Sequence, residues 1–528
     1  MDSRSWPGTA SAVDLTPILH SCLVCSTTFS SSSVCVSTGV PDTEGVCSSP
    51  LALLWPDCAC LLRRSDRCFT RLDPRLRYWY IRLSRVLLPV GSSQAATSAQ
   101  AELAPSSGTR RRVAVVVGIV FIDLLGFGII IPILPFYVRS FGVSDVFIGL
   151  LAASYSLAQF GAAPVLGRIS DERGRRPVLM LSVGVGGIAW ILFGFAAEIS
   201  AGFGVTLGLV ALFGARLLAG AAGGNIATAQ AYIADVTSPD ERTSALGLVG
   251  AAFGLGFVFG PAIGGILASE TVVSTARALL PGFVPVSPFS LPSFAAAGFS
   301  FLALAATVVV LQEPDRIRSP ARRVTFVAQF RTALADLTLR PLVIAFFLTS
   351  LAFAGMTTMF VPLLADFFGY DATAAAIFLA YIGALGIINQ GVLVGWLSRK
   401  VGVRYVVRGG VVALFLALVL LAVSPMAGTT SLLGSGPGWV TSGLVVLVAF
   451  GALASFGNGA ITVGLAALVS EGAAGGAQGA AFGVTQGAGS LGRTVGPPLA
   501  AAAYVVVYWS PFIAGALLLM PVALLLRR

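Results

Sequence analysis

Apolar residues are grouped in long runs along most of this chain, and short polar segments separate the runs. From Val113 onward each run holds roughly 20 residues, enough for a helix to cross about 30 Å of hydrocarbon. Only 11% of the 528 residues are charged and 56% are hydrophobic, so a soluble globule is excluded. The pattern predicts an all-α polytopic membrane protein with twelve transmembrane helices, near residues 113–137, 145–166, 177–197, 204–233, 242–268, 291–311, 341–364, 372–395, 405–424, 438–465, 479–505 and 509–526.

A long basic segment, rich in arginine from Arg316 to Arg340, divides the twelve predicted helices into two sets of six. We therefore expect an N-terminal six-helix bundle over 110–311, a cytoplasmic basic linker over 312–340 and a C-terminal six-helix bundle over 341–528. Two bundles of this kind leave a cavity between them near the midplane, and rocking around that cavity gives alternating access.

The fifth and eleventh predicted spans carry matching glycine patterns, which makes the two bundles pseudo-symmetric. Each pattern has a glycine, a second glycine after eight residues, and a Gly-Pro pair three residues later. The small and helix-breaking residues of the two spans are Gly247, Gly256, Gly260, Pro261, Gly264, Gly265, Gly483, Gly492, Gly496 and Pro497. Small residues let helices approach closely and Gly-Pro permits a bend, so this set is predicted to serve packing and hinge motion.

Positive charge is distributed unevenly between the two sides of the predicted membrane. Twenty arginine and lysine residues fall in the segments on one side, whereas only Arg139 and Arg277 fall on the other. Because cytoplasmic segments retain positive charge, this bias places both termini in the cytoplasm of a multi-pass cytoplasmic-membrane protein. The formal net charge of +10 is thus an orientation signal, and no nucleic-acid partner is expected.

Residues 1–109 differ from the remainder in composition. They hold all seven cysteines and the only histidine, His20, among many serines. Cys22-x-x-Cys25 beside His20 permits a zinc or redox site, because thiolates at this spacing can share a metal. The odd cysteine count and the absence of a regular second CxxC favour a disordered extension, or a translation start further downstream near Val113, and we expect no metal site.

The loop after the second span carries a compact motif, Gly167-Arg-Ile-Ser-Asp171-Glu-Arg-Gly174-Arg175-Arg176. Gly174 permits a positive φ, the arginine pair can anchor helix ends at the lipid headgroups, and Asp171 can accept hydrogen bonds from a helix amino end. The motif resembles the loop 2–3 signature of the major facilitator superfamily. The resemblance implies a gate latch between the two halves, and the alternative is an ordinary tight turn with topogenic arginines.

Two other motifs strengthen this resemblance. Arg216-Leu-Leu-Ala-Gly220 resembles the span-four signature of the same superfamily, and the glycine pattern of span five is similar to a motif of its proton-coupled drug exporters. Asp123-Leu-Leu-Gly-Phe-Gly and Pro132-Ile-Leu-Pro135 in span one make residues 110–528 similar to the twelve-span drug/proton antiporters that include the tetracycline exporters. The resemblance implies secondary active, proton-coupled export of a small amphipathic solute by a monomer without a cofactor.

Three charged residues lie deep within the predicted spans: Asp123, Arg216 and Arg493. Each costs several kcal/mol unless it is paired or lies in a wet cavity, so each is a candidate for function. We predict that Asp123 carries the coupling proton and that Arg216 tunes it, the alternative being a buried structural ion pair. Arg493 can attract an anionic group of a substrate, pair with Asp123 across the cavity, or snorkel without such a role.

Uncharged polar residues at membrane depth are candidate substrate contacts. Most such residues in membrane proteins bond neighbouring helices, and a minority face a cavity. Together with Arg493, the candidates are Tyr155, Gln159, Asn225, Asn389 and Gln390. Tetracycline exporters have further acids in spans three and nine, whereas residues 177–197 and 409–424 contain none, which argues against tetracycline itself and against strongly cationic drugs.

Other classes of protein fit the sequence less well. The spans contain no histidine and no cysteine, which excludes metal or thiol chemistry within them, so we expect no enzyme and no cofactor. The only lysine, Lys400, is not part of a GxxxxGK[ST] loop, which excludes ATP-driven transport by this chain. Proton-coupled uptake by a symporter remains the nearest alternative, followed by a membrane receptor or scaffold that transports nothing.

Overall fold

The computed structural model describes residues 107–314, 326–427, 441–472 and 478–526, all within the unit Gln100–Arg528. The candidate metal or redox site at Cys22 and Cys25 lies outside the described residues. Part of the predicted basic linker also lies outside them, and the part inside includes a short helix, α15 (Phe326–Ala335).

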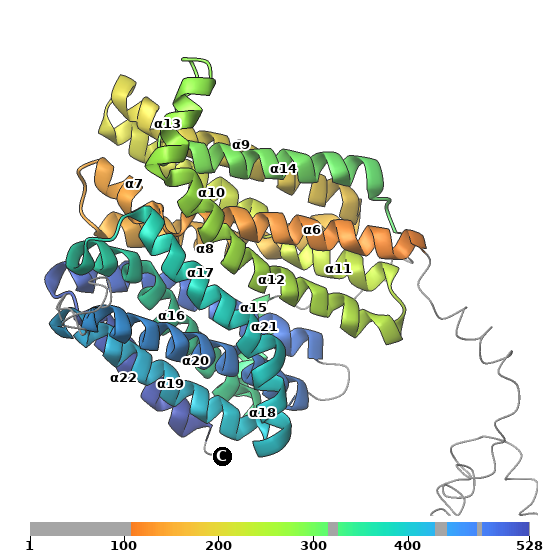
Figure 1. Cartoon of the computed structure of the whole chain (residues 1–528). Coiled ribbons are helices and arrows are strands. Elements are labelled where there is room, and N and C mark those ends of the chain that lie inside the picture. Colours follow the sequence, from red (N-terminus) through yellow and green to blue (C-terminus); the bar gives the residue numbers. More distant parts are fainter. Residues whose placement is uncertain (1–106, 315–325, 428–440, 473–477, 527–528) are drawn as a thin grey trace, which may run out of the picture. The chain divides into compact units, whose positions relative to one another are not determined.

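Helices joined by short turns make up the described part of the chain (Figure 1). We use "first half" for α6 (Ser107–Ile130), α7 (Leu134–Ser140), α8 (Val146–Arg173), α9 (Arg175–Phe203), α10 (Val205–Gly223), α11 (Ile226–Val236), α12 (Pro239–Ala268), α13 (Glu270–Leu279) and α14 (Ser290–Val310). The "second half" comprises α16 (Leu339–Phe368), α17 (Ala372–Ile388), the π-helix η1 (Asn389–Leu393), α18 (Val394–Val401), α19 (Val403–Val423), the 3-10 helix η2 (Ser424–Ala427), α20 (Ser442–Gly472), α21 (Gln478–Val506) and α22 (Ser510–Leu525).

Ten helical segments of the described residues are long and apolar enough to cross a membrane. They coincide with the first ten predicted spans, and three of them are formed by consecutive helices: α10 with α11, α17 with η1 and α18, and α19 with η2. The last two predicted spans are also helical. Glycines and Arg493 lower the hydropathy of α21, and α22 is an apolar helix of 16 residues. The predicted all-helical membrane fold is confirmed.

The halves form two groups of helices, coloured orange to green and teal to blue in Figure 1, and they meet along two helix pairs. In the first pair α8 packs on α21, and the Cα of Gly149 lies so close to Pro497 that a Cβ on Gly149 would be 2.4 Å from the Pro497 carbonyl oxygen. In the second pair α12 packs on α17, where a Cβ on Gly383 would lie 3.0 Å from the carbonyl oxygen of Phe257. The surface of contact between the halves is therefore built on small residues.

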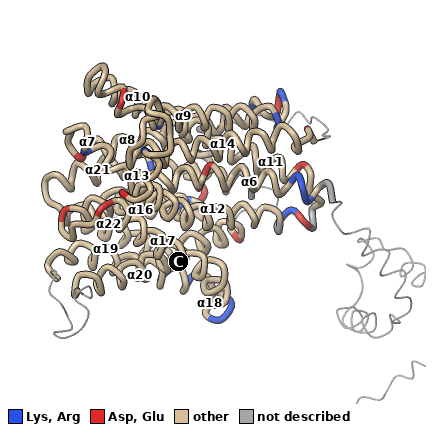
Figure 2. The backbone as a smooth tube through the Cα atoms, turned by 45° about the horizontal axis from the view of Figure 1, so that its top comes forward, with Lys and Arg blue, Asp and Glu red and all other residues tan. Residues whose placement is uncertain are grey.

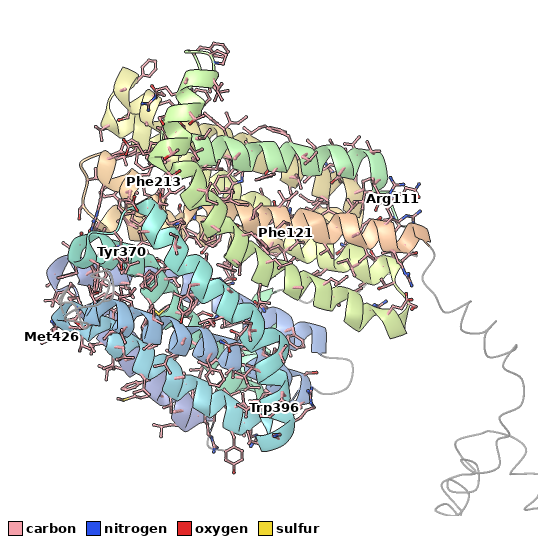
Figure 3. The ribbon with its side chains drawn as sticks, in the orientation of Figure 1. Arg111, Phe121, Phe213, Tyr370, Trp396 and Met426 are labelled. Atoms are coloured by element: carbon pink, nitrogen blue, oxygen red, sulfur yellow. The ribbon has the colours of Figure 1, made fainter. Side chains whose placement is uncertain are left out.

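Charged residues mark the two ends of the helix bundle (Figure 2). We call the end at which α6 and α9 begin and α18 ends the basic end, because arginines of the α8–α9 and α18–α19 turns gather there. The opposite end carries α7, α13 and the α16–α17 turn. In Figure 3, Arg111 and Trp396 lie toward the basic end, whereas Tyr370 and Met426 lie toward the opposite end.

Glycines with positive φ end several helices and repeat between the halves. Gly174, between α8 and α9, has φ of 118°, and Gly402, between α18 and α19, has φ of 90°. Gly167-x-x-x-Asp171-x-x-Gly174 and Gly395-x-x-x-Arg399-x-x-Gly402 have the same spacing, so Gly402 is the counterpart of Gly174. The positive φ predicted for Gly174 is confirmed and occurs at Gly402 as well. At each position only glycine adopts the required backbone without strain.

The predicted glycine pattern packs one helix pair in each half. A Cβ on Gly256, Gly260 or Gly264 of α12 would lie between 2.3 and 2.7 Å from atoms of α6. On α21, a Cβ on Gly492 or Gly496 would lie 2.6 or 2.5 Å from a carbonyl oxygen of α16. The same face of each repeat thus brings two backbones into contact. Both helices run on through Pro261 and Pro497.

The remaining glycines of the pattern have different surroundings. Gly265 contacts the other half, because a Cβ there would lie 2.3 Å from Cβ of Ala376. A Cβ on Gly247 or Gly483 would have no neighbour within 4 Å. Close packing accordingly involves the central glycines of each pattern, and the first glycine of each pattern faces open space.

We predict that Gly264→Ala destabilises the protein and that Gly247→Ala does not. The added methyl group at Gly264 meets the backbone carbonyl of Ile129, which has no room to move, and overpacking of this kind costs about 1–3 kcal/mol. At Gly247 the methyl group meets nothing, and alanine favours the helix. Thermal unfolding of the purified variants measures the difference, and equal midpoints would contradict the packing argument.

Candidate functional site

Asp123 of α6 is held by an amide rather than by an arginine. Its Oδ2 accepts a hydrogen bond of 2.7 Å from Nδ2 of Asn225, which is fully buried. Asn225 lies at the break between α10 and α11, directly after Gly223 and Gly224. The glycine pair allows the helix to be interrupted there, and the interruption directs the amide toward α6. Asp123 itself is part-buried.

Arg216 of α10 is packed against aromatic rings. Its guanidinium carbon lies 4.7 Å from the ring centroid of Tyr155 and 5.6 Å from that of Phe127, within cation–π range. The side chain is 2% exposed, and its Nε and Nη1 have no hydrogen-bond partner among the described residues. The ion pairs found in the described part of the chain do not include one between Arg216 and Asp123.

Two glycines of α10 allow Tyr155 and Gln159 of α8 to complete this site. A Cβ on Gly220 would lie 2.2 Å from the Tyr155 carbonyl oxygen, and a Cβ on Gly223 would lie 2.6 Å from its hydroxyl oxygen. Nε2 of Gln159 donates a hydrogen bond of 3.1 Å to the Gly223 carbonyl. Asp123, Tyr155 and Gly223 line one small cavity together with Gly186, Trp190, Ala219 and Ala222.

The structure therefore brings five of the predicted site residues into one cluster. We call it the central site: Asp123, Tyr155, Gln159, Arg216 and Asn225. All five belong to the first half. Their chain positions are far apart, and α6, α8 and α10 with the following break bring them together.

Arg493 of α21 reaches the central site from the second half. Its Nη2 donates a hydrogen bond of 2.8 Å to Oγ of Ser490 on the preceding turn, and the side chain is part-buried. Tyr155 lies within electrostatic range of both Arg216 and Arg493. Tyr155 thus interacts with two arginines that come from different halves.

Asn389 and Gln390 lie away from this cluster, in the π-helix η1. The buried Asn389 donates a hydrogen bond of 3.1 Å from Nδ2 to Oγ of Ser455 on α20. The side chain of Gln390 lies beside Gly459, also on α20. Both residues join neighbouring helices of the second half, and an interrupted helix of this kind often accompanies a functional position.

The loop between α8 and α9 is organised around Arg175. Its Nη1 lies 2.7 Å from Asp171, its Nε lies 3.2 Å from Asp235 of α11, and Nη1 also bonds Ser170. Arg175 is buried by these contacts and does not extend to the headgroups as predicted from the sequence. The loop therefore ties α8, α9 and α11 of the first half together.

An acid that the sequence analysis did not single out caps the amino end of α9. The carboxylate of Glu313 accepts hydrogen bonds of 2.7 and 2.8 Å from the backbone N–H groups of Arg175 and Arg176. Sequence reasoning singled out Asp171 as an acceptor for a helix amino end, and the structure adds Glu313, three residues after the end of α14, as the acceptor at the start of α9. Free N–H groups at a helix start favour negative charge, but no local sequence pattern links Glu313 to this helix start, because it lies 138 residues from Arg175.

Comparison with known proteins assigns the chain to a family. Residues 116–437, more than half of the chain, match the family described as Major Facilitator Superfamily. The chain belongs to the Major Facilitator Superfamily. The resemblance read from the three sequence motifs is thereby confirmed.

Similar proteins indicate what kind of superfamily member this is. The class C tetracycline resistance protein of Escherichia coli is 31% identical over 345 residues, covering 64% of this chain and 78% of the relative. Multidrug resistance protein 1 of Bacillus subtilis is 29% identical over 289 residues, covering 55% and 67%. A solved bacterial homolog to the human lysosomal transporter Spinster, in its inward-facing and unoccupied conformation, has a TM-score of 0.63 at 15% identity and covers 80% and 96%. The chain is thus a multi-pass membrane transporter of small solutes, and not an enzyme.

The opposite end of this superfamily member holds an ionic cluster that joins the halves. Arg139 of α7 forms two hydrogen bonds of 2.8 and 2.6 Å with Asp145, and two of 2.7 and 3.0 Å with Asp366 of α16. The hydroxyl of Tyr504 on α21 donates a hydrogen bond of 2.8 Å to Asp366. We call these four residues the outer cluster. Sequence reasoning treated Arg139 only as a residue on the side poor in positive charge.

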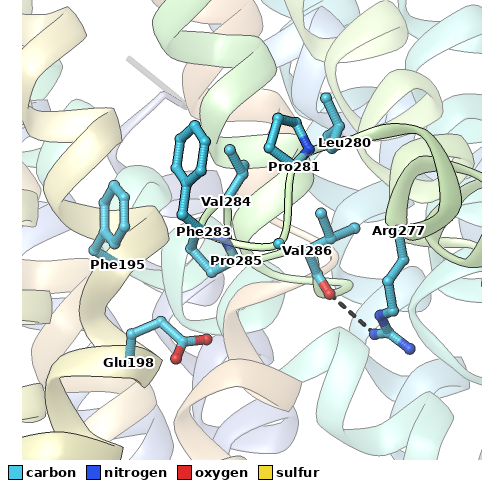
Figure 4. Close-up of a pocket in the computed structure, with 10 residues that line it drawn as sticks. Phe195, Glu198, Arg277, Leu280, Pro281, Phe283, Val284, Pro285 and Val286 are labelled. Atoms are coloured by element: carbon cyan, nitrogen blue, oxygen red, sulfur yellow. Dashed lines mark hydrogen bonds between the residues drawn. The ribbon is translucent and has the colours of Figure 1, made fainter.

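A pocket of about 430 Å³ also lies at the opposite end of the transporter, between α9 and the segment after α13 (Figure 4). Phe195 and Glu198 line one side, and residues 280–286 line the other, where Arg277 donates a hydrogen bond of 3.0 Å to the Val286 carbonyl. Phe283 is 83% exposed. The pocket belongs to the first half alone and has no contact with the central site.

For the loop between α8 and α9, we predict that Gly174→Ala lowers thermal stability and transport rate and that Gly167→Ala leaves both unchanged, although the two glycines belong to the same motif. Alanine at φ of 118° is strained by about 1–3 kcal/mol, and its methyl group would lie 2.9 Å from the Glu313 carboxylate. A Cβ on Gly167 has no neighbour within 4 Å. Thermal stability and transport rate of both variants test this. A harmful Gly167→Ala with a normal Gly174→Ala would refute it.

Proposed function

We propose that this chain is a proton-coupled exporter of a small amphipathic solute, in which Asp123 carries the coupling proton and Arg216 tunes it. It acts as a monomer in the lipid bilayer of the cytoplasmic membrane, with its basic end and both termini in the cytoplasm. The first and second halves rock about the α8–α21 and α12–α17 contacts to give alternating access.

The observation that carries the proposal is the hydrogen bond between Asp123 and Asn225 at membrane depth. A carboxylate in hydrocarbon needs a hydrogen-bond donor or a positive charge beside it. An amide donates the hydrogen bond without supplying a compensating charge. An arginine pair would hold the acid in its ionised form. With an amide as partner, the same side chain can gain and lose a proton as access changes.

The resistance proteins to which the chain is similar support export as the direction. The gating assignment of Gly167, Asp171, Gly174, Arg175 and Arg176 rests on the place of this loop at the basic end and on its resemblance to the superfamily motif, since the ion pairs of Arg175 lie within the first half. We assign to this loop the closing of the cytoplasmic side in the outward-facing state.

A test of the proton role is Asp123→Asn with Glu270→Gln as control. The asparagine retains the size of the side chain and removes the titrating group, so uncoupler-sensitive transport into inside-out vesicles is expected to fall at least about tenfold. Solute exchange without a proton gradient is expected to persist. Glu270 lies exposed at the start of α13, and its variant should transport normally. Undiminished proton-driven transport by Asp123→Asn would remove Asp123 from the mechanism.

Proton-coupled uptake is the second candidate, and one observation favours it. Arg216 and Arg493 outnumber Asp123 in and beside the central site. A proton on Asp123 leaves two positive charges there, and simultaneous binding of a proton and an anion is the condition for symport. In proteoliposomes with an imposed solute gradient, an interior that becomes acidic as solute enters indicates symport, and one that becomes alkaline indicates exchange.

The outer cluster supports an inward-facing state of the transport cycle. Arg139 lies in the first half and Asp366 and Tyr504 lie in the second, so their contacts close the opposite end across the interface. Bidentate arginine–carboxylate contacts have well-defined geometry and are stronger than single surface ion pairs. Opening toward the outside must break them.

We therefore predict that Asp366→Asn shifts the transporter toward its outward-open state, whereas Asp371→Asn does not. Asp371 lies on the same α16–α17 turn but caps α17 within its own half, through the backbone N–H of Ala374. Hydrogen–deuterium exchange of residues 131–146 and 364–372 should increase in Asp366→Asn relative to the control. Equal exchange in the two variants would show that the outer cluster does not hold this end closed.

A further inference from the structure

The charges around the central site do not balance. Arg216 and Arg493 contribute two positive charges, and Asp123 contributes at most one negative charge. Asp123 is bonded by a neutral amide, so neither arginine is neutralised by it within ion-pair distance. An uncompensated guanidinium at membrane depth is expensive, and such residues usually mark a solute pathway.

Each arginine has unused hydrogen-bonding capacity. Arg216 is 2% exposed and has two guanidinium nitrogens without a partner among the described residues. Arg493 uses Nη2 to bond Ser490, a neutral hydroxyl on its own helix. A guanidinium presents five donors, and carboxylate, sulfonate or phosphate oxygens match its planar fork.

The two arginines differ in accessibility. Arg493 is part-exposed on α21, the helix that packs on α8 at the contact between the halves. Arg216 is buried and packs on the ring of Tyr155. A solute between the halves would therefore bond Arg493 directly, while Arg216 adds positive potential through the aromatic ring.

Aromatic side chains lie beside the same place. Phe127 contacts Tyr155 at 4.9 Å between ring centroids and Phe257 of α12 at 6.0 Å. Phe257 is 42% exposed and lies near the contact with α17. An apolar or aromatic body packs well against such rings.

We propose that the transported solute is an amphipathic organic anion, whose acidic group binds Arg493 and whose apolar body packs against Phe127, Tyr155 and Phe257. The proposal rests on the proposed transport function and names the solute class for it. It applies to export and to uptake alike, because it concerns the charge of the solute and not its direction.

The test compares anions with neutral analogues of the same shape. The purified full chain is titrated with 1-naphthoate, 1-naphthalenesulfonate and decanoate, and with the amide of each, and the same compounds are offered to proteoliposomes. Each anion that binds is expected to bind at least about tenfold more tightly than its amide, which is the discrimination of roughly 1.4 kcal/mol that one charged contact supplies.

Variants of Arg493 assign the contact. Arg493→Gln is expected to abolish the preference for the anion and leave amide binding unchanged, while Arg493→Lys retains part of the preference because the charge remains. Arg242→Gln is the matched control, since Arg242 is exposed at the basic end and donates a hydrogen bond to the Ala234 carbonyl of its own half. Should Arg493→Gln fail to fold, the lysine variant and the anion–amide comparison on the unaltered protein still decide the question.

The outcomes separate the solute class from transport itself. Equal binding of anions and amides, tighter binding of organic cations such as ethidium, or no binding of any anion would overturn the proposal while export of other compounds stands. Anion binding without flux under any gradient would support the anion site and contradict the transport function. Loss of preference in Arg242→Gln as strong as in Arg493→Gln would show a general effect of surface charge and overturn the assignment of Arg493.

Discussion

A charge within hydrocarbon must be bonded or hydrated, and this constraint organises the centre of the transporter. Asp123 accepts a hydrogen bond from the amide of Asn225, and Arg216 forms cation–π contacts with two aromatic rings. Neither solution cancels the charge. The carboxyl remains available for protonation and the guanidinium retains free donors, whereas a direct ion pair between them would have used both groups to stabilise a fixed structure.

Close helix contacts make each half a unit that can move as a body. The glycines of α12 bring its backbone against α6, and those of α21 bring its backbone against α16. Contacts of this kind resist sliding, because displacement by a fraction of an ångström brings backbone atoms into collision. In the proposed cycle the two halves move about the helix pairs between them, where Gly149 and Gly383 allow the backbones to approach closely.

Much of this arrangement could be predicted from the sequence, and the parts that could not depend on long-range contacts. Hydropathy identified the spans, and glycine spacing identified the packing faces and the turn at Gly174. Glu313 was not identified as the cap of α9, and the contact of Arg139 with Asp366 was not identified, because the residues of these pairs lie 138 and 227 positions apart in the chain. Charge alone suggested Arg216 as the partner of Asp123. Only the course of the backbone after Gly224 shows that Asn225 takes that position.

Helix α21 connects the central site with the outer cluster. Arg493, beside Tyr155, and Tyr504, bonded to Asp366, lie eleven residues apart on this helix, roughly 16 Å at about 1.5 Å per residue. A helix transmits displacement along its axis because its backbone hydrogen bonds prevent local stretching. In the proposed cycle, a solute that draws Arg493 toward the first half would therefore also move Tyr504, and with it Asp366 of the same half, relative to Arg139. Binding at the centre and closure at the opposite end are in this way properties of one rigid element, and each can bias the other.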